Sequence, residues 1–213
     1  MHNYKEYEFN SFNQKIGMPV ETPAVAYQPE ALHGQYVQLL PVAAEHVRTE
    51  GFQALWEAIE TEPDASCWTW LPYPGFDFSV QLENALINNF NFPGSHHFLI
   101  VYNSKILGWI ALLNERQQYQ AIEIGNVYFS HRLKRTTATT EVMYLLLNSC
   151  FEQGFRRVEW KCDDLNEPSM KAAYRFGFQY EGTFRQDRIS KGRNRNTAWF
   201  SVLDHEWDVM QKS

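Results

Sequence analysis

The stretch from Ala121 to Asp163 constrains the fold of this chain most, because its apolar pattern changes period twice. Ala121–Ser130 (AIEIGNVYFS) has the pattern of a strand. Thr136–Gln153 then carries apolar residues at helical spacing and ends before a glycine stop signal at position 154. Arg157–Asp163 (RVEWKCD) is again typical of a strand. A strand, a helix and a strand in succession predict a crossover connection inside a mixed sheet.

The flanking segments predict the remainder of that sheet. The expected strands are Gly34–Leu40, His97–Tyr102, Ile106–Leu113, Phe178–Arg188 and Thr197–Asp204, with SKGRNRN separating the last two. The expected helices lie within Ala43–Ile59, from Ser79 onward and at Asn166–Phe176. The order is β-α-α-β-β-β-α-β-α-β-β, an α+β fold with about seven strands and about four helices. Gly125, inside a strand, indicates a bulge or a close backbone approach.

The chain has 213 residues, which is enough for one domain with a sizeable core. We expect an extended arm over residues 1–30, with three prolines and several aromatic residues, and a single domain over 31–213. Hydrophobic residues make up 44% and aromatic residues 15% of the chain, so general disorder is excluded. No apolar run reaches the roughly 18–20 residues of a membrane helix. The three cysteines have no metal-ligand spacing, and we expect a reduced, cytoplasmic protein without a metal site.

The formal net charge of −6 is divided unevenly along the chain. Residues 1–115 hold 4 basic and 13 acidic side chains, whereas residues 116–213 hold 15 basic and 12 acidic ones. The overall sign argues against a nucleic-acid partner, but the second half is suited to a local anion site. The acidic first half favours an acceptor that arrives as a cation.

The start of the predicted helix Thr136–Gln153 is one such anion site. Lys134 and Arg135 precede it, and four threonines follow within Thr136–Thr140. A helix N-terminus presents free N–H groups and a partial positive charge, which suit a phosphate. The alternative is that a threonine only caps the helix and that the basic side chains are solvated.

A second motif follows the strand Arg157–Asp163. It reads Asn166-x-x-Ser169 and continues to Gly177-Phe178. Together the two segments resemble the GNAT superfamily of N-acetyltransferases, closest to the branch of ribosomal-protein N-terminal acetyltransferases. The segments LHGQYVQLLP and FLIVYNSKILGWIALLN resemble that branch's opening strand and central hairpin, and the resemblance covers roughly Leu32–Trp207.

The resemblance implies the GNAT fold, splayed in the middle of its sheet, and acetyl-CoA as cosubstrate. The pantetheine arm would pair with backbone at Val127, Tyr128 and Phe129, and the pyrophosphate would lie on the loop and helix start formed by Lys134, Arg135, Thr136, Thr137, Ala138, Thr139 and Thr140. The family loop is Q/R-x-x-G-x-G/A, and the chain departs from it because no glycine is present. If these residues have helical φ, a Cβ is tolerated there and threonine hydroxyls add hydrogen bonds.

Acetyl transfer to an amine requires a base and a proton donor for the departing thiolate. Many family members use a tyrosine at the position of Ala173; Tyr174 lies about 100° further around the helix and is a poor substitute. The resemblance to the ribosomal-protein branch implies Ser169 as the donor, with Asn166 orienting backbone or cofactor. The alternative is that Asn166 caps the helix and Ser169 is an ordinary first-turn residue.

Two carboxylates are candidates for the base, Glu123 and Asp187. In the ribosomal-protein branch the corresponding residue is a glutamate of the sixth strand, and it aligns nearest Arg188, one residue from Asp187. Side chains alternate between the two faces of a strand, so Asp187 faces the site only if its strand bulges. The alternative for each candidate is that it forms an ordinary ion pair at the surface and takes no part in catalysis. The pKa of a free α-amine is ~7.7–8.0, against ~10.4 for lysine, so an α-amine has a useful neutral fraction at pH 7 and needs no strong base. The absence of a clear base in the sequence therefore slightly favours α-amines as acceptors.

Four aromatic residues are candidates for the wall of an acceptor pocket: Trp68, Trp70, Tyr73 and Trp199. The alternative is that these aromatic side chains pack in the hydrophobic core. Five basic residues in Arg185–Arg195 either form a solvated hairpin tip or contact an acidic peptide or a substrate carboxylate.

Two classes of function follow. The first is an acetyl-CoA-dependent N-acetyltransferase acting by direct attack on a small-molecule amine or a protein N-terminus. The second is a binding or regulatory module that keeps the fold but has lost efficient CoA use. Partners are acetyl-CoA and an amine acceptor; we expect no nucleic acid and no membrane, and a homodimer stays open.

Overall fold

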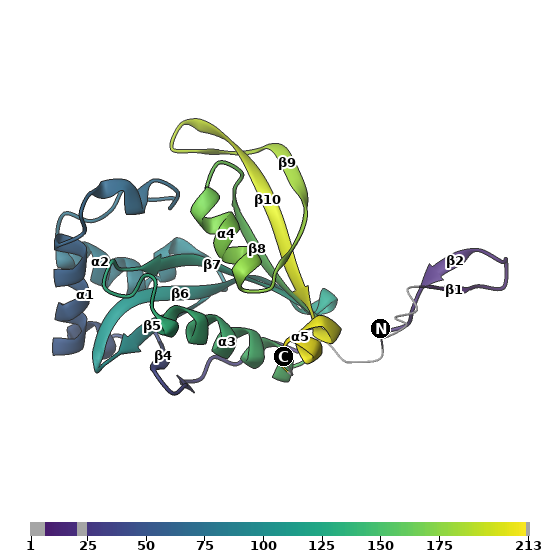
Figure 1. Ribbon diagram of the computed structural model, residues 1–213, viewed down its shortest axis with the longest axis horizontal. Coiled ribbons are helices and arrows are strands. Elements are labelled where there is room, and N and C mark those ends of the chain that lie inside the picture. The colour runs from purple at the N-terminus through teal and green to yellow at the C-terminus, as the bar shows by residue number, and fades with distance from the viewer. Residues whose placement is uncertain (1–6, 21–24, 212–213) are drawn as a thin grey trace.

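The computed structural model describes residues 7–20 and 25–211, most of which build one large twisted sheet with helices on both faces (Figure 1). The sheet has eight strands in the order β3-β4-β5-β6-β7-β8-β10-β9. They are β3 (Leu32–His33), β4 (Val37–Pro41), β5 (His96–Tyr102), β6 (Lys105–Arg116), β7 (Ala121–Phe129), β8 (Arg157–Asp163), β9 (Gln179–Ser190) and β10 (Arg193–Leu203). Only β7 and β8 run parallel, and α3 (Thr137–Glu152) joins them. The crossover predicted from residues 121–163 therefore lies in the middle of the sheet.

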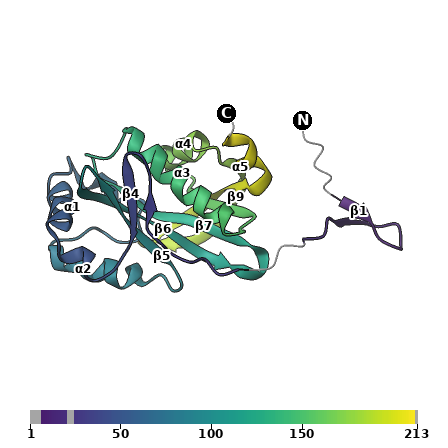
Figure 2. The same cartoon turned by 90° about the horizontal axis from the view of Figure 1, so that it is seen from below.

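The helices are divided between the two faces of the sheet (Figures 1 and 2). One apolar cluster joins α1 (Glu50–Glu60) and α2 (Ser79–Ile87) to Leu99 of β5 and Trp109 of β6. A larger cluster joins α3, α4 (Glu167–Arg175) and α5 (Asp204–Met210) to the opposite face, where Phe98 and Val158 lie. Phe98 and Leu99 thus point to different clusters, as the alternation of side chains along a strand requires.

The α+β class, the mixed sheet and its central crossover are confirmed, with differences at the ends. The described residues hold five α-helices and the main sheet has eight strands, because β3 and α5 were not expected. SKGRNRN does not separate the last two strands, since β9 and β10 continue to a turn at Lys191 and Gly192. Both turn residues have positive φ, 49° and 73°, which suits a two-residue hairpin turn.

The predicted arm over residues 1–30 is partly structured. β1 (Tyr7–Phe9) and β2 (Lys15–Gly17) pair as an antiparallel hairpin that stands apart from the main sheet in both views (Figures 1 and 2). Residues 1–6 and 21–24 of the arm lie outside the described residues. Its end is anchored, because Tyr27 is buried and its Oη lies 2.8 Å from Oγ of Ser149 on α3. Among the described helices, none is long and apolar enough to cross a membrane.

Candidate functional site

β7 and β8 pair along only part of their length. Ala121–Ile124 are in register with Arg157–Trp160, and the pairing stops there. Residues 125–129 and 161–163 continue without pairing to each other, and Figure 1 shows β8, β10 and β9 turning away from β7. The sheet therefore opens into a wedge between β7 and β8, which confirms the predicted splay.

A bulge in β7 marks the start of this wedge. The register passes from Gly125 opposite Ala111 to Tyr128 opposite Trp109, so two residues of β7 face one residue of β6. Asn126 has φ 45°, a left-handed conformation that asparagine adopts more readily than most residues. The bulge predicted at Gly125 is thus one residue further on. Gly125 itself makes a close approach, since a Cβ there would lie 2.8 Å from Cδ1 of Leu113.

The main chain of β7 points into the wedge at alternate residues. The amide of Ser130 donates to the carbonyl of Leu107, so residue 130 faces β6. Backbone groups of successive strand residues point to opposite sides, and Phe129 and Val127 therefore direct theirs to the wedge. Tyr128 faces β6, and a Cβ at Gly108 would overlap its carbonyl oxygen, so that position requires glycine. Of the three predicted backbone contacts, Val127 and Phe129 are available and Tyr128 is not.

A chain of hydrogen bonds holds the bulge from the side of α1 and α2. Tyr73 Oη donates to Asn126 Oδ1 at 2.7 Å, and Asn126 Nδ2 lies 2.8 Å from His97 Nε2. Oγ of Ser95 donates to the carbonyl of Phe92 and lies 3.2 Å from His97 Nδ1. This arrangement requires a neutral His97 with its proton on Nδ1. Burial, followed by the nearby His96, lowers the pKa of His97 to about 4, which is consistent with that state.

The start of α3 offers main-chain donors near the mouth of the wedge. The first amides of an α-helix have no intrahelical acceptor, and Thr136 does not cap them. Its hydroxyl donates instead to the carbonyl of Leu133, and the hydroxyl of Thr139 donates to the carbonyl of Thr136. These two threonines therefore cannot donate to a phosphate, whereas Thr137 and Thr140 are exposed. Ala138 is buried, so it contributes only backbone.

The glycine-free loop before α3 contains one strained residue. Arg135 has φ 62°, in the left-handed region where a glycine carries no penalty and other residues lose about 1 kcal/mol. The condition that all residues of this loop have helical φ is therefore not met. Lys134 is partly committed, since its Nζ lies 3.8 Å from Oε2 of Glu62. Arg135 and Lys134 nevertheless keep exposed side chains beside the first turn of the helix.

Asn166 and Ser169 lie at the start of α4, next to the end of β8. Oδ1 of Asn166 accepts a hydrogen bond from the amide of Ser169, so Asn166 caps the helix. Trp160 Nε1 donates to Ser169 Oγ at 3.1 Å, and the Ser169 hydroxyl also forms a side-chain hydrogen bond with Cys162. Cys162 is a neighbour of Ser169, and burial raises the pKa of its thiol. The half-buried Ser169 hydroxyl can therefore donate to a ligand only by turning away from Cys162.

Asp187, one of the two candidate bases, lies where the pairing of β9 with β10 is irregular. The register between β9 and β10 shifts from Arg188 opposite Arg195 to Phe184 opposite Thr197, and Gln186 has φ 50°. The sequence left open whether such a bulge exists, and it turns Asp187 towards Thr197. The Thr197 hydroxyl donates to Asp187 Oδ2 at 2.7 Å. Together with Arg188 it holds the pKa of Asp187 below its usual range.

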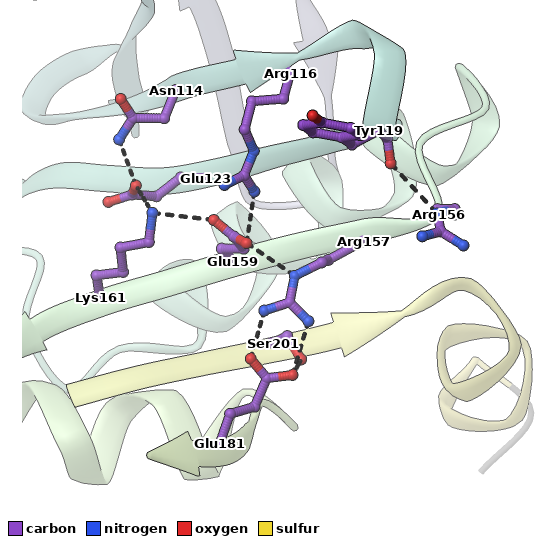
Figure 3. A network of polar contacts seen from close by, with 10 residues as sticks. All are labelled: Asn114, Arg116, Tyr119, Glu123, Arg156, Arg157, Glu159, Lys161, Glu181 and Ser201. Carbon is purple, nitrogen blue, oxygen red and sulfur yellow. Dashed lines mark hydrogen bonds and ion pairs between the residues drawn. The ribbon is translucent and has the colours of Figure 1, made fainter. Parts of the chain in front are cut away.

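Glu123, the other candidate base, belongs to an ion-pair network that crosses five strands, from β6 to β9 (Figure 3). Its Oε2 accepts hydrogen bonds from Asn114 Nδ2 at 2.6 Å and from Lys161 Nζ at 2.8 Å. The network continues through Glu159 to Arg116 and Arg157 and ends at Glu181 and Ser201. The Lys161 ammonium lies between two carboxylates, 2.8 Å from Glu123 Oε2 and 3.0 Å from Glu159 Oε2. The Oε2 of Glu123 is therefore already engaged by Asn114 and Lys161.

The four predicted pocket aromatics occupy different surroundings. Trp68 is core, because it stacks on Tyr128 with ring centroids 5.0 Å apart and is 8% exposed. Trp70 is exposed at 37% and Tyr73 reaches the bulge. Trp199 lies beneath Lys161, whose Nζ is 3.9 Å from the ring centroid. The structure thus brings Tyr73 to the wedge, puts Trp199 on the face of the ion-pair network and removes Trp68 to the interior.

The tip of the β9–β10 hairpin contacts the α1–α2 connection. Lys191 Nζ donates to the carbonyl of Trp68 at 2.6 Å. The basic side chains of this hairpin are therefore not all solvated. Sequence reasoning missed this contact, and it missed Asn126 and His97, because nothing local to these residues indicates what they touch.

Comparisons with known proteins agree with this geometry. The model of the acetyltransferase (GNAT) family matches residues 52–178, more than half of the chain. A GCN5-related N-acetyltransferase from Brucella melitensis superposes with a TM-score of 0.82 and 35% identity over 90% of this chain and 86% of its own. A probable GNAT-family acetyltransferase from Chromobacterium violaceum superposes with a TM-score of 0.78 and 37% identity, and the match covers 91% of this chain and 96% of its own. No functionally curated protein matches the chain in sequence.

The predicted proximity to the ribosomal-protein branch is supported only as a likeness of fold. The acetyltransferase from Salmonella typhimurium that modifies the N-terminal serine of ribosomal protein L7/L12 gives a TM-score of 0.66 at 17% identity. The match covers 80% of this chain and 96% of that one. An identity this low carries no information on the acceptor.

Proposed function

The chain belongs to the GNAT family of acetyltransferases, and from that membership we propose that it transfers the acetyl group of acetyl-CoA to a primary amine by direct attack. The acceptor is a small-molecule amine or a protein N-terminal α-amine. The observation that carries the proposal is the wedge, where β7 stops pairing with β8 at Ile124 and a bulge follows at Asn126. Acetyl-CoA would supply an acetyl group activated as a thioester.

The residues around the wedge fit this cosubstrate. Val127 and Phe129 direct backbone groups to an open strand edge, where an amide-containing arm can pair with them. The uncapped amides that begin α3 at Thr137 face the mouth of the wedge and suit a pyrophosphate. Lys134 and Arg135 add positive charge there. Thr137 and Thr140 are the threonines whose hydroxyls are available to such an anion.

We assign proton transfer to Asp187 and Ser169. The amine nitrogen forms its bond to the acetyl carbon as the carbon–sulfur bond breaks, so the amine loses one proton and the thiolate gains one. Asp187 is ionised at neutral pH and accepts the first proton. Ser169, whose oxygen accepts from Trp160, donates the second, and Asn166 orients the helix start that presents it. Glu123 is the weaker candidate base because of its ion pair with Lys161.

The remaining assignments concern the acceptor side. Tyr73, Trp70 and Trp199 are proposed to line the approach to the wedge, and Trp68 supports it from the core. We propose residues 31–213 as the catalytic domain and residues 1–30 as an arm that either completes a dimer contact or lies over the acceptor cleft. A cytoplasmic protein without nucleic-acid or membrane partners remains our expectation.

A specific observation favours the alternative, a GNAT-fold module with weakened CoA use. Arg135 occupies a left-handed position without being glycine, in the loop that would contact the pyrophosphate. The experiment that separates the two functions is CoA release from acetyl-CoA across a panel of amino acids, polyamines, aminoglycosides and short peptides. Steady release with at least one amine and formation of its acetyl product is the expected result. Binding of acetyl-CoA without turnover of any amine would favour the module.

A further inference from the structure

Arg195 carries a positive charge that no described residue pairs. Its side chain is half-buried, and Nε is buried without a hydrogen-bond partner. Two other arginines of this half of the sheet, Arg157 and Arg188, are each paired with a carboxylate. A guanidinium removed from water without a partner is unfavourable. Arg195 therefore has no ion pair among the described residues, although Asp163 and Asp187 lie near enough to act on its charge.

The unpaired guanidinium lies among the residues proposed to transfer protons. Arg195 shares one face of β10 with Thr197, which holds Asp187, and it lies opposite Arg188 in the register. Burial and then Arg188 lower the pKa of Arg195, whereas Asp163, Cys162 and Asp187 act on it in the opposite direction. The guanidinium thus lies near both the base and the end of β8.

A second donor on this face of β10 is also without a partner. Nε1 of Trp199 is buried and bonds to no described residue. Two cationic side chains, Arg188 and Arg195, act on Asp187, which disfavours an acceptor that carries only positive charge.

We propose that the acceptor amine also bears a carboxylate and that Arg195 binds this carboxylate while the amine lies beside Asp187. The proposal rests on the acetyl transfer proposed above and narrows its acceptor class. A guanidinium is planar and presents pairs of parallel N–H donors that match the two oxygens of a carboxylate. The acidic first half of the chain favoured an acceptor that arrives as a cation. The present proposal replaces that cation with a zwitterion.

The test compares acceptors that differ only in this group. CoA release is measured with amino acids and their carboxamides, and with dipeptides that carry an aspartate or an asparagine after the reacting residue. One charged hydrogen-bonded contact stabilises by about 1.5–3 kcal/mol, so kcat/KM for the carboxylate member should be about tenfold or more above its amide. Equal values for both members of every pair would overturn the proposal while leaving the acetyl transfer intact.

The variant R195M identifies the residue responsible. It should remove the preference for the carboxylate member, mainly through KM of the acceptor, and leave KM for acetyl-CoA unchanged. R195K should keep part of the preference, and R193M, which alters an exposed side chain two residues earlier on β10, should keep all of it. Thermal unfolding checks that each variant is folded. A rise in KM for acetyl-CoA alone in R195M would assign Arg195 to the cosubstrate and overturn the proposal. Absence of turnover with any amine would instead refute the proposed function.

Discussion

The hydroxyl of Tyr73 donates a 2.7 Å hydrogen bond to Oδ1 of Asn126, the left-handed residue at which β7 bulges. Tyr73 belongs to the connection between α1 and α2, so this one bond joins the proposed acceptor side to the strand proposed to hold acetyl-CoA. The other end of the Asn126 amide is held by His97. The shape of the wedge therefore depends on side chains far away in the sequence.

Replacing Tyr73 by phenylalanine should weaken this support. The substitution removes the donor and leaves a half-buried amide oxygen unpaired, at a cost of about 1–3 kcal/mol in the free energy of unfolding. We expect KM for acetyl-CoA to rise as the bulge loses its fixed geometry. Denaturant unfolding and steady-state kinetics measure both effects. Y36F alters an exposed tyrosine and should change neither, and an unchanged KM in Y73F would show that the bond does not set the bulge.

The neutral state of His97 predicts a dependence of stability on pH. Its pKa falls from about 6.5 in the unfolded chain to about 4 in the fold, so below pH 6.5 the unfolded chain takes up a proton that the native state does not. The stabilising effect is present above pH 6.5 and declines as the pH falls towards 4, by up to about 1.4 kcal/mol per pH unit. Urea unfolding at a series of pH values should show a shallower slope for H97Q than for wild type. H33Q, at an exposed histidine, serves as the control and should keep the wild-type slope.

The carboxyl group of Asp187 should respond to Thr197. Because the Thr197 hydroxyl and then Arg188 lower its pKa, Asp187 stays ionised to a more acidic pH than an ordinary aspartate. T197V removes the main hydrogen bond and should raise this pKa towards about 3.9, so the acid limb of kcat/KM moves to higher pH. Carbon-detected NMR titration of the carboxyl measures the shift directly. T183V, on the neighbouring strand, should leave it in place; an identical titration in T197V would refute the assigned cause.

Glu123 and Lys161 provide a contrast between a structural carboxylate and a proposed catalytic one. Their side chains are 9% and 7% exposed, so E123Q removes one partner of a buried ion pair and should destabilise by about 3 kcal/mol. The double variant E123L/K161M should recover much of that loss, since an apolar pair replaces the ionic one. D187N should instead keep its stability and lose about 100-fold in kcat. If E123Q lost activity as D187N does while remaining as stable as wild type, Glu123 would be the base.

The central crossover was predictable because each of its segments carries its own local signal. Apolar Val142, Leu146 and Cys150 fall on one helix face, and the same residues are buried against the sheet. The splay was predictable only through the resemblance, since the end of pairing at Ile124 leaves no trace in composition. The last hairpin was misjudged because a polar turn sequence, SKGRNRN, lies almost entirely inside β9 and β10.

The site was less accessible to sequence reasoning than the fold. Asn166 and Ser169 could be proposed because they stand in one motif, and so could the residues that begin α3. Asn126 and His97 are 29 residues apart and meet only because β5 and β7 both neighbour β6. Such contacts depend on the order of strands, which a local pattern does not contain.

The central claim, that the wedge and the first turn of α3 hold acetyl-CoA, is tested most directly by calorimetric titration of wild type and T137E with acetyl-CoA. A glutamate at this exposed first position interacts favourably with the helix dipole and should preserve or raise the melting temperature. The same carboxylate repels a pyrophosphate at those amides. Saturable heat for wild type, with affinity at least tenfold weaker in T137E and undiminished thermal stability, is the predicted result. No heat for wild type at millimolar acetyl-CoA, or equal affinity in T137E, would contradict the claim.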